Sequence, residues 1–447
     1  MNLAEAFAIT KGAYDESGRG LTGGRLMRTM RRASLRKVVW GLLLALGIVF
    51  LGGDSLFAGD AILQTSKRHT FDVPGWEIEN FPRKWLHLAA EFGRTGETEA
   101  SRIAKVKSYF ALTERINEVE FRLNQAKAGF FKDEDVVALE AELKEKRRRQ
   151  GKLVADVEET LEGMLTKELK EAKVYRNFLW TRLFWPPVDI RLETLPKTLV
   201  VSRRDRIELV KTRLLDPHIS FEEMEALEAK LDRRNVSTLV ENIGGVATYP
   251  AFVSGDYSLR QALTTAAHEW THHYLFYHPL GRAYWDSGEL TTINETVADI
   301  VGREIGRAVY KRYFATPEEI RQMEMEDLER ARPPATPDPN VFDFWSAMRE
   351  TRLTAERLLG EGKIEEAEAY MEGRRELFAQ HGYFFRKLNQ AYFAFHGSYA
   401  DSPGSVSPIG GQLAAVRKGY DDVGGFLRHV ADYTKARQLE RDSGEGG

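Results

Sequence analysis

The stretch from Ser258 to Pro279, SLRQALTTAAHEWTHHYLFYHP, narrows the choice of structure more than any other part of the chain. Ser258 followed by Gln261 is a capping box that begins a helix, and Pro279 prevents that helix from continuing. We therefore expect a helix of about five turns between them. Within it, His268 and His272 lie four residues apart, so they project from one face on adjacent turns.

This pair of histidines predicts a metal site. Two imidazoles at this spacing bind one tetrahedral Zn²⁺, and Glu269, directly after the first, is close enough to take a proton from water. The string HEWTH is thus an H-E-x-x-H. Because the chain has 0 cysteines, any metal must be held by His, Asp or Glu. The alternative is a helix with scattered surface His and Glu, since His273 and His278 lie nearby without a place in the pattern.

The segments on either side of this helix support the metal site. Upstream, Gly245 to Val253 predicts a short strand that lies at a sheet edge because it contains Pro250. An edge strand beside a zinc helix can bind an extended peptide by strand addition. Downstream, Glu295 and Asp299 share a face of a second predicted helix, so one can bind the metal and the other a ligand histidine. The alternative is that Thr292-x-x-Glu295 is only a capping box.

From about His268 to Asp299, with the preceding strand, the sequence resembles the gluzincin clan of zinc metallopeptidases, the thermolysin-like group. That clan joins a strand, an HExxH helix and a following helix with a glutamate ligand in an ExxxD pattern. The resemblance implies a zincin-like catalytic domain. Its Zn²⁺ ligands would be His268, His272 and Glu295. Glu269 would be the general base, and Asp299 would orient a ligand histidine.

A looser resemblance involves the two ends of the chain. The apolar N-terminal segment and the late stretch LNQAYFAFHGSY are similar to a family of bacterial aminopeptidases of the same clan. No amine-binding motif of the GxMEN type occurs in the chain. Both exopeptidase and endopeptidase action therefore stay open.

A zinc peptidase also needs donors for the oxyanion that forms when water attacks a carbonyl. The candidates beyond the third ligand are Tyr383, Tyr392, His396 and Tyr399. We favour Tyr399 and His396, because HGSY lies where a helix runs into a loop rich in Ser, Pro and Gly. The alternative is that these aromatic residues belong to the core.

The N-terminal end predicts a single-pass membrane anchor. Residues 1–37 are rich in Lys and Arg, and Val38 to Gly53 has no charged or polar side chain. Extending this apolar run to Phe57 gives a span of 38–57. The distribution of positive charge places residues 1–37 in the cytoplasm and the rest outside, in the periplasm or on the cell surface. A cleaved signal peptide and a buried core helix are the alternatives.

Residues 101–184 predict a long helical hairpin with coiled-coil character, after a linker at 58–100. The chain has no proline from Ser101 to Arg182, and apolar residues recur there at three–four spacing. Such a hairpin would serve as a stalk, a gate or a surface for self-association. The alternative is a set of solvated helices packed on the main body.

The remainder predicts the catalytic domain at 185–440 and a disordered tail at 441–447. Val188 to Leu215 is extended, with a hairpin at Arg203-Arg204-Asp205-Arg206, and Phe221 to Arg234 is a short helix. Gly425 to Arg437 predicts a last amphipathic helix. The fold class is therefore α+β, mainly helical, with a small sheet beside the HExxH helix.

Composition narrows the partners. The formal net charge of −3 shows none of the excess positive charge that is typical of proteins that bind nucleic acid. We expect a peptide or protein substrate, and a membrane contacted through the N-terminal helix. The leading hypothesis is a membrane-anchored zinc metallopeptidase. The alternatives are a zinc amidase acting on cell-wall peptides, a membrane-tethered helical scaffold, and a zinc-binding pseudo-peptidase without activity.

Overall fold

The computed structural model describes residues 61–77, 79, 97–127, 133–178, 181–330, 342–399, 402 and 404–444. Within these ranges, no helix combines the length and the apolar character that a membrane span needs. The predicted anchor at 38–57 lies outside the described residues, as does the predicted cytoplasmic tail. The chain divides into Met1–Gln64 and Thr65–Gly447. The elements below belong to the second unit, apart from the start of α3 (Ala61–Ser66).

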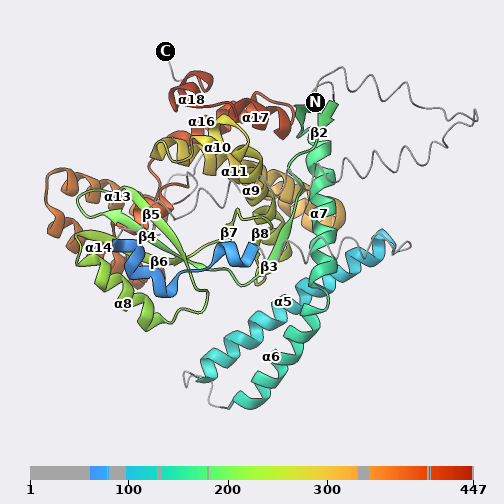
Figure 1. The fold of residues 1–447 in the computed structure, drawn as a ribbon, viewed down its shortest axis with the longest axis horizontal. Coiled ribbons are helices and arrows are strands. Elements are labelled where there is room, and N and C mark those ends of the chain that lie inside the picture. Colours follow the sequence, from blue (N-terminus) through green and yellow to red (C-terminus); the bar gives the residue numbers. More distant parts are fainter. Residues whose placement is uncertain are drawn as a thin grey trace, which may run out of the picture. The chain divides into compact units, whose positions relative to one another are not determined.

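The expectation of a mainly helical α+β protein is confirmed (Figure 1). One three-stranded sheet has the order β3-β8-β7, with β3 at Ile190–Glu193, β7 at Gly245–Val246 and β8 at Ala251–Ser254. The central strand β8 runs parallel to β3 and antiparallel to β7. This small sheet lies against the helix that carries HEWTH.

The predicted single strand at Gly245–Val253 is wrong in one respect. The segment forms two strands, β7 and β8, and Pro250 lies in the turn between them after a cis peptide bond. Proline has no N–H to give to a ladder, so it is accommodated outside the strands. The edge of the sheet is accordingly the two-residue strand β7, and β8 is central.

A second sheet has the order β5-β4-β6 and is antiparallel throughout, with β4 at Lys197–Arg203, β5 at Leu209–Leu215 and β6 at Val236–Asn242. The predicted hairpin is confirmed as the β4–β5 connection. The predicted short helix is confirmed as α8 (Phe221–Asp232), which joins β5 to β6 and begins at a capping box formed by Ser220.

Three helices cover this second sheet, and together they enclose a separate core. They are α13 (Phe344–Gly360), α14 (Ile364–Gln380) and α15 (Gln390–His396). The buried core residues are Val200, Leu239, Met348, Ala355, Met371, Phe378, Leu388, Ala391, Tyr392 and Phe393. The predicted helix that runs into the HGSY loop is confirmed as α15.

The predicted HExxH helix is confirmed as α9 (Leu259–Phe276), with both hydrogen bonds of the predicted capping box present. After the short α10 (Pro279–Arg282), α11 (Gly288–Tyr313) packs along it. Two glycines of α11 permit the close approach. A Cβ on Gly302 would lie 2.8 Å from the Thr264 carbonyl oxygen, and one on Gly306 would lie 2.7 Å from the Thr264 Cα.

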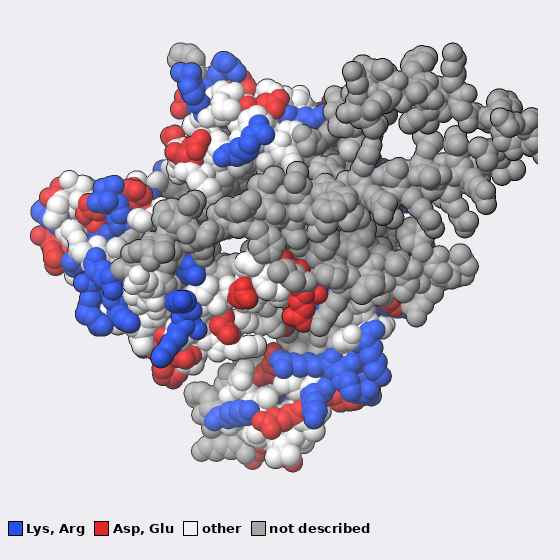
Figure 2. Space-filling model, viewed as in Figure 1, with Lys and Arg blue, Asp and Glu red and all other residues white. Residues whose placement is uncertain are grey.

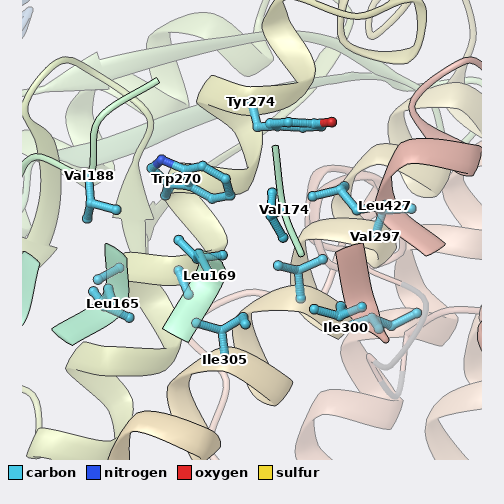
Figure 3. Packing of buried hydrophobic residues seen from close by; sticks show 14 of the residues in the cluster. Leu165, Leu169, Val174, Val188, Trp270, Tyr274, Val297, Ile300, Ile305 and Leu427 are labelled. Carbon is cyan, nitrogen blue, oxygen red and sulfur yellow. The ribbon is translucent and has the colours of Figure 1, made fainter. Parts of the chain in front are cut away.

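The main core surrounds these two helices. α7 (Val154–Glu171) contributes Leu165 and Leu169, which pack near Trp270 of α9 and Ile305 of α11 (Figure 3). The C-terminal helices α16 (Ile409–Lys418) and α17 (Val423–Val430) complete this core from the other side.

The predicted last helix at Gly425–Arg437 is wrong, because it is interrupted. α17 ends at Val430 and α18 begins at Arg437 (Arg437–Asp442). The Ala431 carbonyl accepts a hydrogen bond from the Leu280 N–H, so it is engaged by the chain before α11.

The predicted hairpin is shorter than 101–184. It consists of α5 (Glu99–Lys127) and α6 (Val136–Gly151), which pair through Val119, Leu123 and Leu139. Side chains of both charge signs cover the hairpin (Figure 2), among them the pair Lys127–Glu140.

The rest of the 101–184 range does not belong to the hairpin. The first half of α5 packs into the main core through Val106 and Phe110, together with the whole of α7. A small hairpin, β1 (Arg176–Phe178) and β2 (Thr181–Leu183), then leads to β3 of the first sheet.

Candidate metal centre

α9 and α11 bring three predicted ligands to one point. The Nε2 atoms of His268 and His272 lie 3.0 Å apart, and each is 3.6 Å from Oε2 of Glu295. The donor atoms of this group all lie within 4.8 Å of one another. The two histidine side chains are only 14% and 15% exposed. The alternative of scattered surface histidines is therefore wrong.

The capping-box interpretation of Glu295 is also wrong. α11 begins at Gly288, and Ser287 is its N-cap, so Glu295 lies two turns inside the helix. The Thr292 hydroxyl donates to the Gly288 carbonyl and caps nothing.

The second nitrogen of each histidine has a partner on α11. His268 Nδ1 lies 2.9 Å from Asp299 Oδ1, and His272 Nδ1 lies 2.9 Å from Asn294 Oδ1. Because both partners offer an oxygen, each Nδ1 carries the proton and donates. In that neutral tautomer, Nε2 of each ring is the atom that can bind a metal. Asp299 lies as predicted, whereas the role of Asn294 was missed although it directly precedes Glu295.

A third side chain, Tyr284, was also missed. Its hydroxyl donates to Oε1 of Glu295 at 2.5 Å, while Oε2 of the same carboxylate faces the histidines. Burial and the charge of Glu295 raise the pKa of Tyr284 well above its ordinary value, so the phenol keeps its proton. Tyr284 lies in the irregular segment between α10 and α11. Residue spacing predicts contacts only within a regular helix or strand, so it could not predict this contact.

Glu269 lies beside the three ligands without belonging to them. It is 6% exposed, and a Cβ on Gly245 of β7 would lie 2.3 Å from its Oε1. A side chain at 245 would displace the Glu269 carboxylate, so the strand approaches that carboxylate closely. Burial raises the pKa of Glu269, and the neighbouring histidines partly oppose that shift.

The two predicted oxyanion donors lie in different surroundings. The negative charges of Glu295, Glu269 and Asp299, together with burial, raise the pKa of Tyr399 well above its ordinary value. The Tyr399 phenol is therefore close enough to these carboxylates to be affected by their charge. His396 Nε2 is instead 3.9 Å from Glu241 of β6.

The two remaining tyrosine candidates lie in the second core and its margin. Tyr392 is buried, and Tyr383 stacks on Phe344. Of the four predicted donors, the structure relates Tyr399 to the carboxylates of the site.

The electrostatics of the group suit a dication. Burial lowers the pKa of His268, but Asp299 and Glu295 outweigh it and raise that pKa well above its ordinary value. The pKa of Glu295 is strongly lowered, because the two histidines outweigh its burial. Two imidazole nitrogens and a buried carboxylate that attracts positive charge therefore form a group that could hold a metal ion.

No protein-family model matches the chain, and no match was found among curated proteins or solved structures. The class of protein is therefore defined by its fold and its candidate site alone. This is a mainly helical α+β protein in which two histidines and one glutamate, from two packed helices, form a group that could hold a metal ion.

Proposed function

We propose that this chain is a zinc metallopeptidase of the gluzincin type, with His268, His272 and Glu295 as the metal ligands. One observation carries the proposal. The three donors converge with their outer partners in place, and Glu269 lies beside them as a carboxylate that is not a ligand. A purely structural zinc site has no use for such a group. Zn²⁺ bound here would polarise a carbonyl and lower the pKa of water.

Glu269 is the general base in this proposal. It takes a proton from water and later passes it to the leaving amine. Its pKa is raised by burial, which moves it toward the pH at which a base of this kind operates. The phenols of Tyr284 and Tyr399 keep their protons. Tyr399 donates to the oxyanion, and Tyr284 does so by turning its single O–H away from Glu295 when the substrate binds.

The substrate would bind at β7. At the β3 edge of the sheet, the backbone N–H groups of Ile190 and Leu192 already donate to Glu162 and Glu158 of α7, each at 2.8 Å. β7 forms the other edge, next to Glu269. An extended peptide pairing with β7 would place a peptide bond near the base.

We also propose that residues 38–57 anchor the enzyme in a membrane, with residues 1–37 in the cytoplasm and the catalytic domain outside. The support is the apolar run and the excess of Lys and Arg before it. Adding a protease to spheroplasts, which opens both the periplasm and the cell surface to it, should degrade the catalytic domain and spare a tag placed at residue 1. Protection of the domain would contradict this topology.

The function is tested by metal content and peptide hydrolysis measured on the same preparations. Wild type should hold about one zinc per chain, as the ligand set requires. Glu295→Ala should lose it, and Glu269→Gln should keep it while hydrolysis falls about 10²–10⁴-fold. Glu289→Ala, an exposed glutamate on the same helix, is the matched control and should change neither. Wild type without zinc after reconstitution would contradict the proposal. Zinc without hydrolysis would identify a pseudo-peptidase.

A further inference from the structure

The peptide group that joins Thr248 to Tyr249, in the turn between β7 and β8, is held from both sides. His273 Nε2 lies 2.7 Å from the Thr248 carbonyl oxygen and donates to it. The Tyr249 N–H donates to Glu77 Oε1 at 3.2 Å. The carbonyl and the N–H belong to one planar unit, so these two contacts fix both of its ends. Glu77 is 3% exposed.

The two side chains come from opposite faces of the sheet. Successive residues of a strand point to opposite faces, and the register pairs Gly245 with Val253 and Val246 with Phe252. Gly245 faces α9, because its missing Cβ would meet Glu269. The Phe252 ring is stacked on the Trp76 ring, with centroids 3.8 Å apart.

The segment that carries Glu77 is itself fixed on that second face. Trp76 Nε1 donates to Glu193 of β3 at 3.0 Å. The Phe71 N–H donates to the Leu214 carbonyl of β5 at 3.0 Å. Glu77 therefore reaches the turn from a support that is separate from α9.

On α9 the side chains divide between two neighbours. His268 and His272 face α11 and the proposed metal. Glu269 and His273, also four residues apart, face β7 and the turn after it. One stretch of helix thus sets the position of the base and of the turn that ends the edge strand.

We propose that His273 and Glu77 are positioning residues that clamp the Thr248–Tyr249 peptide group and so hold β7 in place against Glu269. The inference rests on the proposed function, since β7 is the edge where a peptide substrate would pair. Neither residue belongs to the metal-binding group. They act through the position of the strand, so their loss should affect substrates that pair along β7 and spare the metal.

The test uses the full chain with four variants: His273→Ala, His273→Gln, Glu77→Ala and Glu77→Gln. Glutamine keeps a donor at 273 and an acceptor at 77. The matched controls are His218→Ala and Glu79→Ala, both exposed positions. Each protein is measured for zinc content, for amide hydrogen exchange in the segment 244–256, and for kcat and KM on a long peptide and a short one.

Both alanine variants should keep their zinc and exchange the amides of 244–256 about tenfold faster, the effect of losing one hydrogen bond. KM for the long peptide should rise about tenfold with little change in kcat. The short peptide, which pairs little with β7, should be affected less. The glutamine variants should restore exchange and KM, and the controls should match wild type.

Unchanged exchange in both alanine variants would overturn the proposal, as would equal losses on the long and short peptides. Loss of zinc in His273→Ala would also overturn it, because the residue would then act on the metal site. If His273→Ala does not fold, Glu77→Ala tests the same peptide group from the other face. A wild type without hydrolysis would refute the proposed function, and hydrogen exchange would still decide whether the clamp exists.

Discussion

Asn294 accepts a hydrogen bond from His272 Nδ1 at 2.9 Å, on the same helix that supplies Glu295. Asp299 makes the equivalent contact with His268 at the same distance. One helix therefore provides a proposed metal ligand and the hydrogen-bond partner of each histidine. Because Asn294, Glu295 and Asp299 all lie on α11, the rigid helix fixes their positions relative to one another.

Replacing Asn294 by alanine should weaken zinc binding about 10–100-fold, because His272 loses the partner that fixes its tautomer and ring orientation. Asn294→Asp keeps an acceptor oxygen and should retain most of the affinity. Competition with a chelator of known affinity measures both. Equal affinities for wild type and Asn294→Ala would show that the contact does not orient the ligand.

Tyr284→Phe should keep zinc and lose activity. The phenol donates its single proton to Glu295, and in the proposed mechanism it turns that proton to the oxyanion when the substrate binds. Loss of one such donor lowers kcat about 10²–10³-fold. Tyr383→Phe is the control, since Tyr383 stacks on Phe344 at the margin of the second core. A kcat unchanged in Tyr284→Phe would leave the hydroxyl only the role of holding Glu295.

Local rules in the sequence were enough to predict α9, the pair of histidines on one of its faces, and the pair of carboxylates on one face of α11. A capping box, a proline and four-residue spacing all act within one helix, so a single sequence reveals them. Tyr284, Asn294 and His273 were not predicted to act, because their partners are set by the packing of different elements. His273 even counted as a residue without a place in the pattern, yet it bonds a turn 25 residues away.

The strand at Gly245–Val253 shows the same limit. The proline led to the prediction of one edge strand, whereas Pro250 lies in the turn between the edge strand β7 and the central strand β8. A two-residue strand such as β7 is too short for any alternation of polar and apolar residues. The close approach of Gly245 to Glu269 depends on how the sheet lies on α9. Likewise, the periodicity of 101–184 identified helices but could not show that α7 is buried in the main core.

Gly306→Ala should destabilise the site through the packing of α9 on α11. The added Cβ would lie 2.7 Å from Thr264 Cα and N, which are backbone atoms that cannot rotate away. Overpacking of this kind costs about 1–3 kcal/mol of unfolding free energy, and it should weaken zinc binding because the ligands come from both helices.

Gly373→Ala, in α14 with nothing within 4 Å of the new atom, is the matched control for Gly306→Ala. It should be neutral or stabilising by about 0.4–1 kcal/mol. Urea unfolding and zinc titration measure both variants. A Gly306→Ala protein as stable as wild type would show that the helices separate without cost.

Stability at low pH should depend on Glu228, which is fully buried on α8. Burial raises its pKa, but hydrogen bonds from Arg386 and Lys387 outweigh that effect, and the pKa is lowered below 4.5. A carboxyl with a lowered folded pKa stabilises the protein above its unfolded pKa. This contribution should be lost as pH falls below about 4.5 through the folded pKa.

Glu228→Gln removes one partner of a buried pair and should cost about 3–5 kcal/mol of unfolding free energy at pH 7, with a smaller difference from wild type at acid pH. Urea unfolding at several pH values measures this, and Glu225→Gln, exposed on the same helix, should behave as wild type. A Glu228→Gln protein with the pH dependence of wild type would assign the acid sensitivity to other carboxylates.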